Sequence, residues 1–249
     1  MNKDSAEAVE FLESLAPQVG SETMNVRVRL FPPFLSLESS ARAAIAEVGG
    51  GRIEIGAQNA HWEENGAFTG EISGPMLKAI GVNQVLIGHS ERRQFFGETD
   101  ETVFKRTKSL LSQGFEVMVC VGESLAERES GKTRIVIERQ IASVFTDKLV
   151  NPFCDGRVSI AYEPVWAIGT GKTASPVQAQ EVHRLIREWL AANVSEGASN
   201  MTPILYGGSV KPGNFSELLS CADIDGGLVG GASLEVDTFA SLVKIAKQH

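Results

Sequence analysis

Short apolar runs recur along the chain, and each is followed by turn residues and then by a longer stretch with helical spacing. Short continuous apolar runs bounded by turn residues are typical of strands buried on both faces, and strands that alternate with helices favour right-handed βαβ units in a parallel sheet. The pattern therefore predicts an α/β fold, either a closed barrel or a large doubly wound sheet. The seven predicted strands are Val26–Phe31, Arg52–Ala57, Val85–Ile87, Val117–Val121, Val158–Tyr162, Pro203–Tyr206 and Gly227–Val229.

Explicit start signals mark several of the helices between these runs. Capping boxes stand at Ser124–Glu127 and Ser175–Gln178, the second with proline at the first helical position. Thr99 opens another helix, and Gly114 stops it. The chain begins with a helix, because Asp4 is a cap and the apolar stripe after it has helical spacing; we expect this helix to end at Pro17.

Composition narrows the class of protein. The 249 residues are 43% hydrophobic with a net charge of -8 and a mean hydropathy of -0.03, which is typical of one soluble globular domain and fits a single barrel over residues 1–249. No apolar run is long enough to cross a membrane, and the net negative charge of the protein disfavours binding to nucleic acid. The N-terminus has no secretion signal, so we expect a cytoplasmic protein. Three widely spaced cysteines predict neither disulfides nor a metal site.

Candidate chemistry lies where the strands end, because a parallel barrel builds its active site from the loops after its strands. A lone histidine or a lone glutamate in such a loop is more often structural than catalytic. Here a base, an electrophile and two glycine-rich anion cradles are expected on one rim, and the final strands are where barrels commonly bind phosphate. The clusters are Gly88–Arg93, Glu163–Thr173, Gly207–Val210 and Gly230–Ser233.

These segments resemble the triosephosphate isomerase family. Its motifs are matched in family order, and the likeness extends from Met1 to the C-terminus. The resemblance implies a (β/α)8 TIM barrel that interconverts dihydroxyacetone phosphate and glyceraldehyde 3-phosphate in glycolysis and gluconeogenesis without a cofactor or metal. The matching segments are Gly56–Asn59, Gly66–Glu71, Ile87–Arg93, Ala161–Lys172, Tyr206–Ser209 and Leu228–Ser233.

The resemblance also implies a role for each site residue. Glu163 matches the base that moves a proton between two carbons, and His89 matches the neutral imidazole that polarises the carbonyl oxygen. An apolar lid is expected to exclude water and to close over the base, which raises its basicity by desolvation. Backbone N–H groups for the phosphate are implied at Gly169, Ser209, Gly230 and Gly231, and closure over the base at Ile168 and Leu228.

The segment Gly66–Glu71 matches the loop that the family inserts into a neighbouring subunit. The resemblance therefore implies a homodimer, with Thr69 near the tip of the inserted loop. An ordinary long surface loop is the plainer alternative, and glycines suit a protruding turn in both cases.

One family feature is absent from this sequence. The family's first strand ends in Asn-x-Lys, and Met1 and Asn2 match the two residues after that lysine. Lys3 does not replace it by position, and Glu91 matches the carboxylate that normally pairs with it. We expect unpaired strand edges near Val26 and Gly227 and a native chain that begins upstream of Met1.

Two other functions stay open at this stage. A catalytically impaired or dead barrel with a binding or scaffold role is favoured by the absent lysine, because a site cation stabilises a developing oxyanion. An isomerase or aldolase of another phosphosugar is disfavoured by the specific segment Ala161–Lys172.

Overall fold

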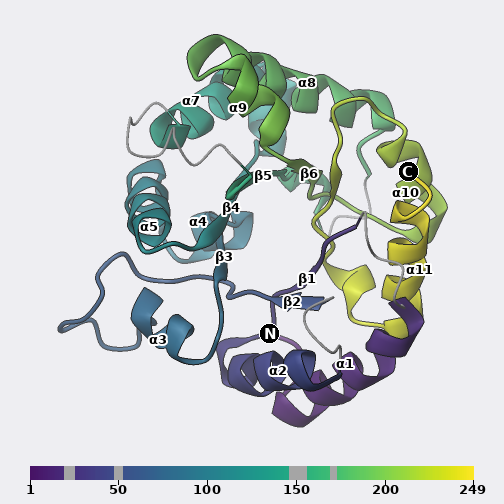
Figure 1. Ribbon diagram of the computed structural model, residues 1–249. Helices are drawn as coiled ribbons and strands as arrows, with labels where there is room; N and C mark the ends of the chain where they lie inside the picture. The colour runs from purple at the N-terminus through teal and green to yellow at the C-terminus, as the bar shows by residue number, and fades with distance from the viewer. Residues whose placement is uncertain (20–25, 48–52, 146–155, 169–172) are drawn as a thin grey trace.

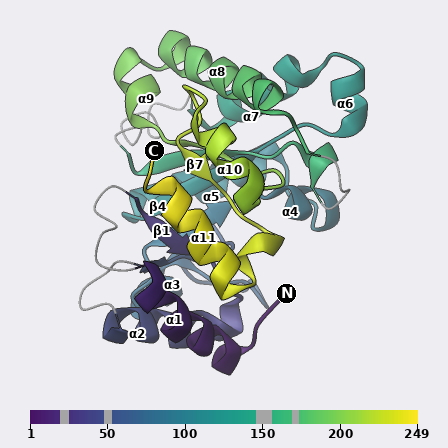
Figure 2. The same ribbon diagram turned by 90° about the vertical axis from the view of Figure 1, so that its right-hand side faces the viewer.

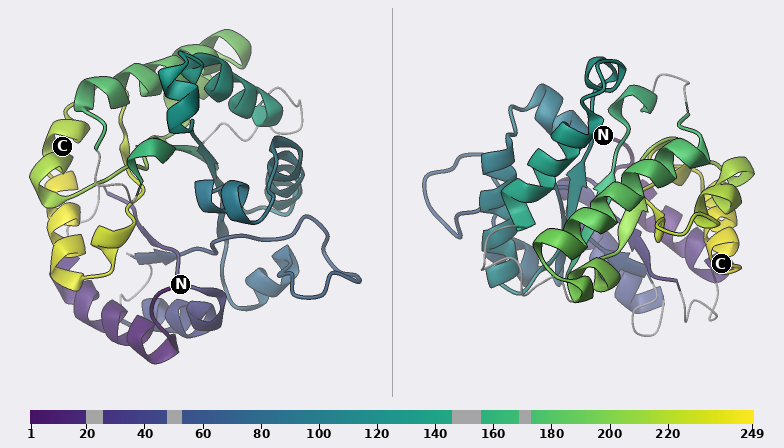
Figure 3. Two further views of the ribbon diagram at one scale, coloured as in Figure 1. Left: turned by 180° about the vertical axis from the view of Figure 1, so that it is seen from behind. Right: turned by 90° about the horizontal axis from the view of Figure 1, so that it is seen from above.

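The computed structural model describes residues 1–19, 26–47, 53–145, 156–168 and 173–249 (Figure 1). In these ranges seven parallel strands follow one another around a central axis, and helices form an outer ring around them (Figures 1 and 3). The strands are β1 (Val28–Leu30), β2 (Ile53–Ile55), β3 (Gln84–Ile87), β4 (Glu116–Val121), β5 (Val158–Tyr162), β6 (Ile204–Tyr206) and β7 (Gly226–Gly227).

The strands are joined in chain order. β1 pairs with β2, and β3 to β7 form a continuous five-stranded sheet. Ala57 links the two parts, because its N–H donates to Gln84 and its carbonyl accepts from Leu86, both at 2.8 Å. Sequential parallel pairing of this kind is the expected result of successive right-handed βαβ units.

The sheet is an arc rather than a closed ring. Within the described residues β1 has β2 as its single strand partner and β7 has β6, which confirms the expected unpaired edges. The final strand also differs from its predicted range, since Leu228 and Val229 lie outside β7. β6 ends at Tyr206, whose carbonyl accepts from the Leu228 N–H at 2.9 Å, and the ladder between the two strands ends with this bond.

Eleven α-helices and two short 3₁₀ segments lie in the described ranges, and none of these helices is long and apolar enough to cross a bilayer. The first and last helices lie side by side (Figure 2). The helices are α1 (Ser5–Val19), α2 (Phe34–Glu47), α3 (Gly74–Ala79), α4 (Ser90–Phe95), α5 (Asp100–Ser112), α6 (Leu125–Glu129), α7 (Thr133–Phe145), α8 (Pro176–Asn193), α9 (Glu196–Met201), α10 (Pro212–Leu219) and α11 (Val236–Ala246), with η2 (Val165–Ala167) and η3 (Gly231–Ser233).

The predicted capping boxes at Ser124 and Ser175 are confirmed, and Thr99 caps α5 as expected. The predicted end of the first helix is wrong, since α1 continues through Pro17 to Val19. Proline removes one N–H and crowds the preceding turn, but α1 ends two residues later. The fully buried side chain of Val19 stabilises that last turn.

The core lies between the strands and the helix ring. Apolar strand residues such as Val119 and Ile160 are fully buried, as are the inward residues Leu110 on α5 and Ile141 on α7. Burial on both sides of the sheet explains why the strands read as continuous apolar runs instead of alternating ones.

Candidate active site

A cavity of about 1680 Å³ opens where the strands end and extends along the gap between β7 and β1. All four polar clusters predicted from the sequence contribute to its lining, so the prediction that they share one face is confirmed. Among the lining residues are His89, Glu163, Ile168, Ser209, Leu228, Gly230 and Gly231.

Glu163 follows β5 directly, and its side chain is almost fully buried at 2% exposure. Its carboxylate accepts from the Ser90 N–H at 2.9 Å and from the Ser90 hydroxyl at 3.0 Å, and its Oε1 lies 3.0 Å from Nε2 of His89. Gly207 allows this approach from β6, because a Cβ there would stand 3.0 Å from Cγ of Glu163. The structure thus brings base and imidazole together.

Burial raises the pKa of the Glu163 carboxyl, because the protein interior disfavours its charged form. His89 and the two Ser90 donors oppose this shift without cancelling it. Within the described residues His89 is the one ion-pairing partner of Glu163. The result is a carboxylate that is more basic than an exposed one, which suits a general base.

His89 is the N-cap residue of α4, and its ring has a defined tautomer. Nδ1 accepts from the Glu91 N–H at 3.4 Å, so Nδ1 carries no proton in this arrangement. The proton of the neutral ring then lies on Nε2, which faces Glu163. A neutral imidazole with Nε2–H directed into the cavity can donate a hydrogen bond to a substrate oxygen.

Glu123, on the loop after β4, was not singled out from the sequence. Its side chain is fully buried, and Oε1 accepts from the Tyr162 hydroxyl at 3.1 Å and from Nε1 of Trp166 at 3.0 Å. Arg128 lies 3.1 Å from the same oxygen and stacks on the Trp166 ring at 4.9 Å. Glu123 therefore anchors the segment that follows the base. The sequence signal for it was weak, a charged residue two positions after an apolar run.

Three of the predicted phosphate-binding residues lie on the cavity wall. No hydrogen bond within the described part of the chain uses the backbone N–H of Ser209, Gly230 or Gly231. A Cβ at either Gly230 or Gly231 would meet open space, so this wall is accessible. Gly169, the fourth predicted residue, lies outside the described residues.

Glu91 and Lys3 lie at the edge of the site. The exposed Glu91 carboxylate is 3.8 Å from Nδ1 of His89. Nζ of Lys3 lies 4.9 Å from the Phe11 ring centroid, and Lys3 has a positive φ of 64°. As expected from its position, Lys3 packs on α1 and not against the base.

The segment Gly66–Glu71 projects from the body between β2 and α3 (Figure 1). Its residues are exposed, with Phe68 at 42%. The Phe68 ring lies 4.4 Å from the His61 ring, which stacks in turn on Trp62. The base of this loop is thus ordered by ring packing, while Thr69 stands in solvent.

Comparison with known proteins identifies the family. The family model described as triosephosphate isomerase matches residues 1–246. The triosephosphate isomerase of Alkaliphilus metalliredigens is 49% identical over 98% of this chain and 95% of its own length. That of Endomicrobium trichonymphae is 50% identical over 99% of this chain and 96% of its own length. This chain therefore belongs to the triosephosphate isomerase family, a family of isomerase enzymes built on the (β/α)8 barrel.

Proposed function

We propose that Glu163 and His89 carry the interconversion of dihydroxyacetone phosphate and D-glyceraldehyde 3-phosphate in this protein. The observation that supports the roles best is the buried carboxylate with a raised pKa, 3.0 Å from Nε2 of the His89 imidazole in one cavity. The family supplies the reaction, and this pair supplies the two groups that it needs. The reaction belongs to glycolysis and gluconeogenesis, and we propose the cytoplasm as its compartment.

The proposed reaction moves one proton between adjacent carbons. Glu163 removes a proton from the carbon beside the carbonyl, and the electron pair of that C–H bond forms an enediolate. Nε2–H of His89 donates to the former carbonyl oxygen and stabilises its developing charge. The ring transfers its proton to that oxygen and regains one from the neighbouring hydroxyl, so the hydroxyl proton passes from one oxygen to the other. The protonated Glu163 then returns its proton to the neighbouring carbon, so the enzyme ends as it began.

The phosphate is proposed to bind on the opposite side of the cavity from the base. Backbone N–H groups of Ser209, Gly230 and Gly231, together with Gly169, are the proposed donors. No described residue accepts from the N–H groups of Ser209, Gly230 or Gly231, and a Cβ at either glycine would meet open space, which supports this assignment for those three residues. Backbone N–H groups bind anions well because they present fixed dipoles.

Water exclusion is the proposed task of the apolar side chains near the base. An enediolate with a neighbouring phosphate eliminates that phosphate if it is free to rotate in water, so a closed site protects the intermediate. Ile168 and Leu228 line the same cavity as Glu163, which supports their proposed role in covering it. Glu91, whose backbone N–H donates to Nδ1 of His89 at 3.4 Å, is proposed to support the ring from behind.

The protruding segment Gly66–Glu71 supports a further proposal, a homodimer in which this loop docks on a second copy. An exposed Phe68 on an ordered loop base suits a protein contact. Sedimentation of the wild-type protein at micromolar concentration is expected to give a dimer, and Thr69→Asp is expected to shift it toward monomer. A monomeric wild type, or a dimer unaffected by Thr69→Asp, contradicts the proposed interface.

The activity itself is tested by assaying the purified chain with glyceraldehyde 3-phosphate. We expect isomerisation in the wild type and a loss of about 10²-fold or more in His89→Gln, since one preorganised donor to an oxyanion is worth that much. Arg184→Lys, which changes one member of an exposed ion pair with Glu188 on α8, is the control for folding. If the wild type fails to isomerise either triose phosphate, the proposed activity is wrong for this chain.

A further inference from the structure

We propose that Gln140 is a positioning residue for the isomerisation: its amide fixes the Gly122 peptide, and that peptide sets the place of both Glu163 and Glu123. The inference rests on the proposed function for its kinetic consequence only. Gln140 lies on α7, outside the cavity lining, and the sequence patterns gave it no role.

The amide of Gln140 binds the two peptide groups that flank Gly122. Nε2 donates to the Gly122 carbonyl at 3.1 Å, and Oε1 accepts from the Gly122 N–H at 2.8 Å. Gly122 stands one residue past β4, which ends at Val121, so the neighbouring strands no longer pair its backbone. Gln140 is 5% exposed, and water has little access to replace these two bonds.

The clamped peptide is packed directly against the backbone of the base. A Cβ at Gly122 would lie 1.8 Å from the carbonyl oxygen of Glu163 and 2.8 Å from its carbonyl carbon. The Glu163 N–H also donates to Val121 at 2.7 Å. Because glycine is required here by the close approach, a shift of the Gly122 peptide must move Glu163 or open a gap beside it.

The same turn carries the anchor of the following segment. Glu123 is the next residue after Gly122, and its carbonyl accepts from the Val165 N–H at 3.2 Å. Its carboxylate holds Tyr162 and Trp166, as described above. One side chain on α7 thus fixes the turn on which the base and the segment after it both rest.

Loss of the two hydrogen bonds between Gln140 and Gly122, which together form the clamp, is expected to change kcat more than KM. Misplacement of a catalytic group by about 1 Å costs up to about 10²-fold in rate. The proposed phosphate donors at Ser209, Gly230 and Gly231 do not contact Gln140, so KM is expected to stay near the wild-type value. Because a general loss of structure would also lower the apparent kcat at constant KM, kcat is calculated per folded molecule.

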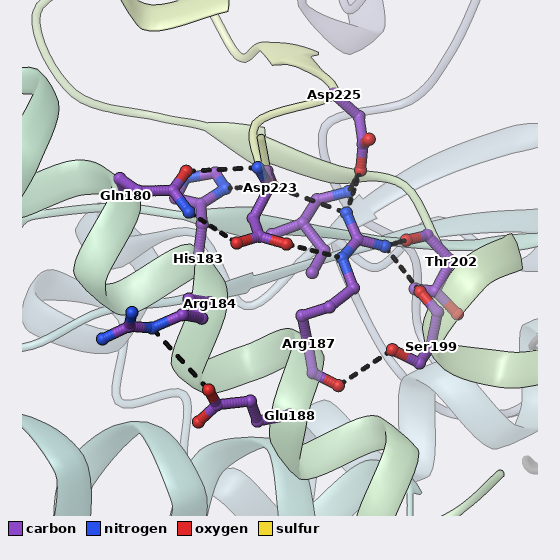
Figure 4. Close-up of polar contacts among 10 residues, drawn as sticks. Gln180, His183, Arg184, Arg187, Glu188, Ser199, Thr202, Asp223 and Asp225 are labelled. Carbon is purple, nitrogen blue, oxygen red and sulfur yellow. Dashed lines mark hydrogen bonds and ion pairs between the residues drawn. The ribbon is translucent and has the colours of Figure 1, made fainter. Parts of the chain in front are cut away.

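Gln180 on α8 provides a matched control (Figure 4). Its amide also binds one residue from two sides, since Nε2 donates to the Asp223 carboxylate and Oε1 accepts from the Asp223 N–H at 3.1 Å. We expect Gln140→Met to lower kcat about tenfold or more with KM within about twofold. Gln180→Met is expected to lower Tm to a similar degree and to leave both constants within about twofold.

A second variant separates hydrogen bonding from packing. In Gln140→Glu a protonated carboxyl can donate to the Gly122 carbonyl and accept from its N–H, whereas the ionised form can only accept. The ratio of kcat in Gln140→Glu to kcat in the wild type is therefore expected to rise as the pH falls. Because the wild type is measured at each pH, the titration of Glu163 cancels from this ratio.

Amide hydrogen exchange tests the clamp without turnover. Exchange in the segments that contain Gly122 and Glu163 is expected to be faster in Gln140→Met than in the wild type and unchanged in Gln180→Met. Unchanged exchange in Gln140→Met overturns the proposal, whatever happens to kcat, and so does a fall in kcat that Gln180→Met shares. If the wild type has no isomerase activity, the proposed function fails while the exchange experiment still decides on the clamp.

Discussion

Two clusters of charged side chains lie at opposite ends of the strands, and they differ in how their charges are balanced by neighbouring groups. Glu163 and His89 lie where β5 and β3 end, whereas Arg187, Asp223 and Asp225 gather where β6 and β7 begin. The two ends of a parallel barrel commonly divide catalysis and stability in this way.

In the cluster around Arg187 the positive guanidinium is paired with the carboxylates of Asp223 and Asp225 (Figure 4). The guanidinium lies 2.6 Å from the Asp225 carboxylate and 3.6 Å from that of Asp223, and it donates to the carbonyls of Ser199 and Thr202 at 2.5 and 3.1 Å. Asp225 in turn accepts from the Ile204 N–H at 2.7 Å, which ties α8 to the start of β6. Every contact joins two elements of the fold.

In the described part of the chain no arginine or lysine lies within ion-pairing distance of Glu163, and its one basic neighbour is His89. Its carboxylate is held by neutral donors, and burial leaves its pKa raised. The comparison shows two uses of charge. An ion pair whose charges are matched stabilises the fold, whereas a buried carboxylate without a matching cation keeps the basicity that proton abstraction needs. Opposite effects of mutation on stability and on rate should separate the two clusters.

The largest expected effect is on rate, in Glu163→Gln. Removing the general base should lower kcat/KM by about 10³-fold, within the range of acid–base catalysis. Unfolding in denaturant should show no loss of stability, because a buried carboxylate is replaced by a neutral amide of the same shape. If Glu163→Gln is strongly destabilised, or if it keeps its activity, the claim that the Glu163 cluster serves catalysis and not stability is contradicted.

Arg187→Met should have the converse effect. It leaves Asp223 and Asp225 without their cation. Breaking a buried ion pair costs about 3–5 kcal/mol, and because the Asp225 side chain is 40% exposed we expect a loss near the lower end of that range. Denaturant unfolding measures this loss, while kcat/KM of the folded protein should change less than about twofold. Arg184→Met removes an exposed pair with Glu188 on the same helix and serves as control, with an expected loss below about 0.5 kcal/mol.

His183 gives the structural cluster its own pH dependence. Burial lowers the pKa of this imidazole to about 4, and its Nδ1 lies 3.2 Å from the Asp223 carbonyl. The unfolded chain binds the proton more readily, so stability is complete above about pH 6.5 and is lost as the pH falls toward 4. The loss between pH 7 and pH 5 should be about 2 kcal/mol, and His183→Gln should flatten this part of the curve.

Glu163 should give the smallest of these effects on stability, with the opposite sign. Its folded pKa is raised, so the folded protein holds the proton more tightly than the unfolded chain does. Stability should therefore fall as the pH rises from the unfolded value near 4.3 through the folded pKa. The stability of Glu163→Gln relative to the wild type should increase across this window. A difference that stays constant with pH is incompatible with a raised pKa.

Local signals in the sequence were sufficient for much of the fold. Capping boxes at Ser124 and Ser175 predict helix starts because they satisfy backbone donors within four residues. The predicted end of the first helix at Pro17 was wrong, because burial of the last turn of α1 outweighs the local effect of proline. Strand ends were also imprecise, since β7 stops where its partner β6 stops, which is a property of pairing.

The candidate site was partly predictable for the same reason. Residues directly after apolar runs lie on the cavity wall because parallel strands end at one face. Glu123 and Gln140 were missed, since their roles depend on partners far along the chain. Gln140 meets Gly122 across 18 positions, and no short pattern specifies that contact.

Proton exchange with solvent during turnover tests the central claim most directly. In deuterium oxide, a base that holds the abstracted proton long enough for exchange should place deuterium on the carbon beside the carbonyl, in product and in recovered substrate. We expect this labelling in the wild type and a loss of both labelling and isomerisation, by about 10³-fold, in Glu163→Gln. Labelling at the wild-type rate in Glu163→Gln would contradict the assignment of Glu163 as the base.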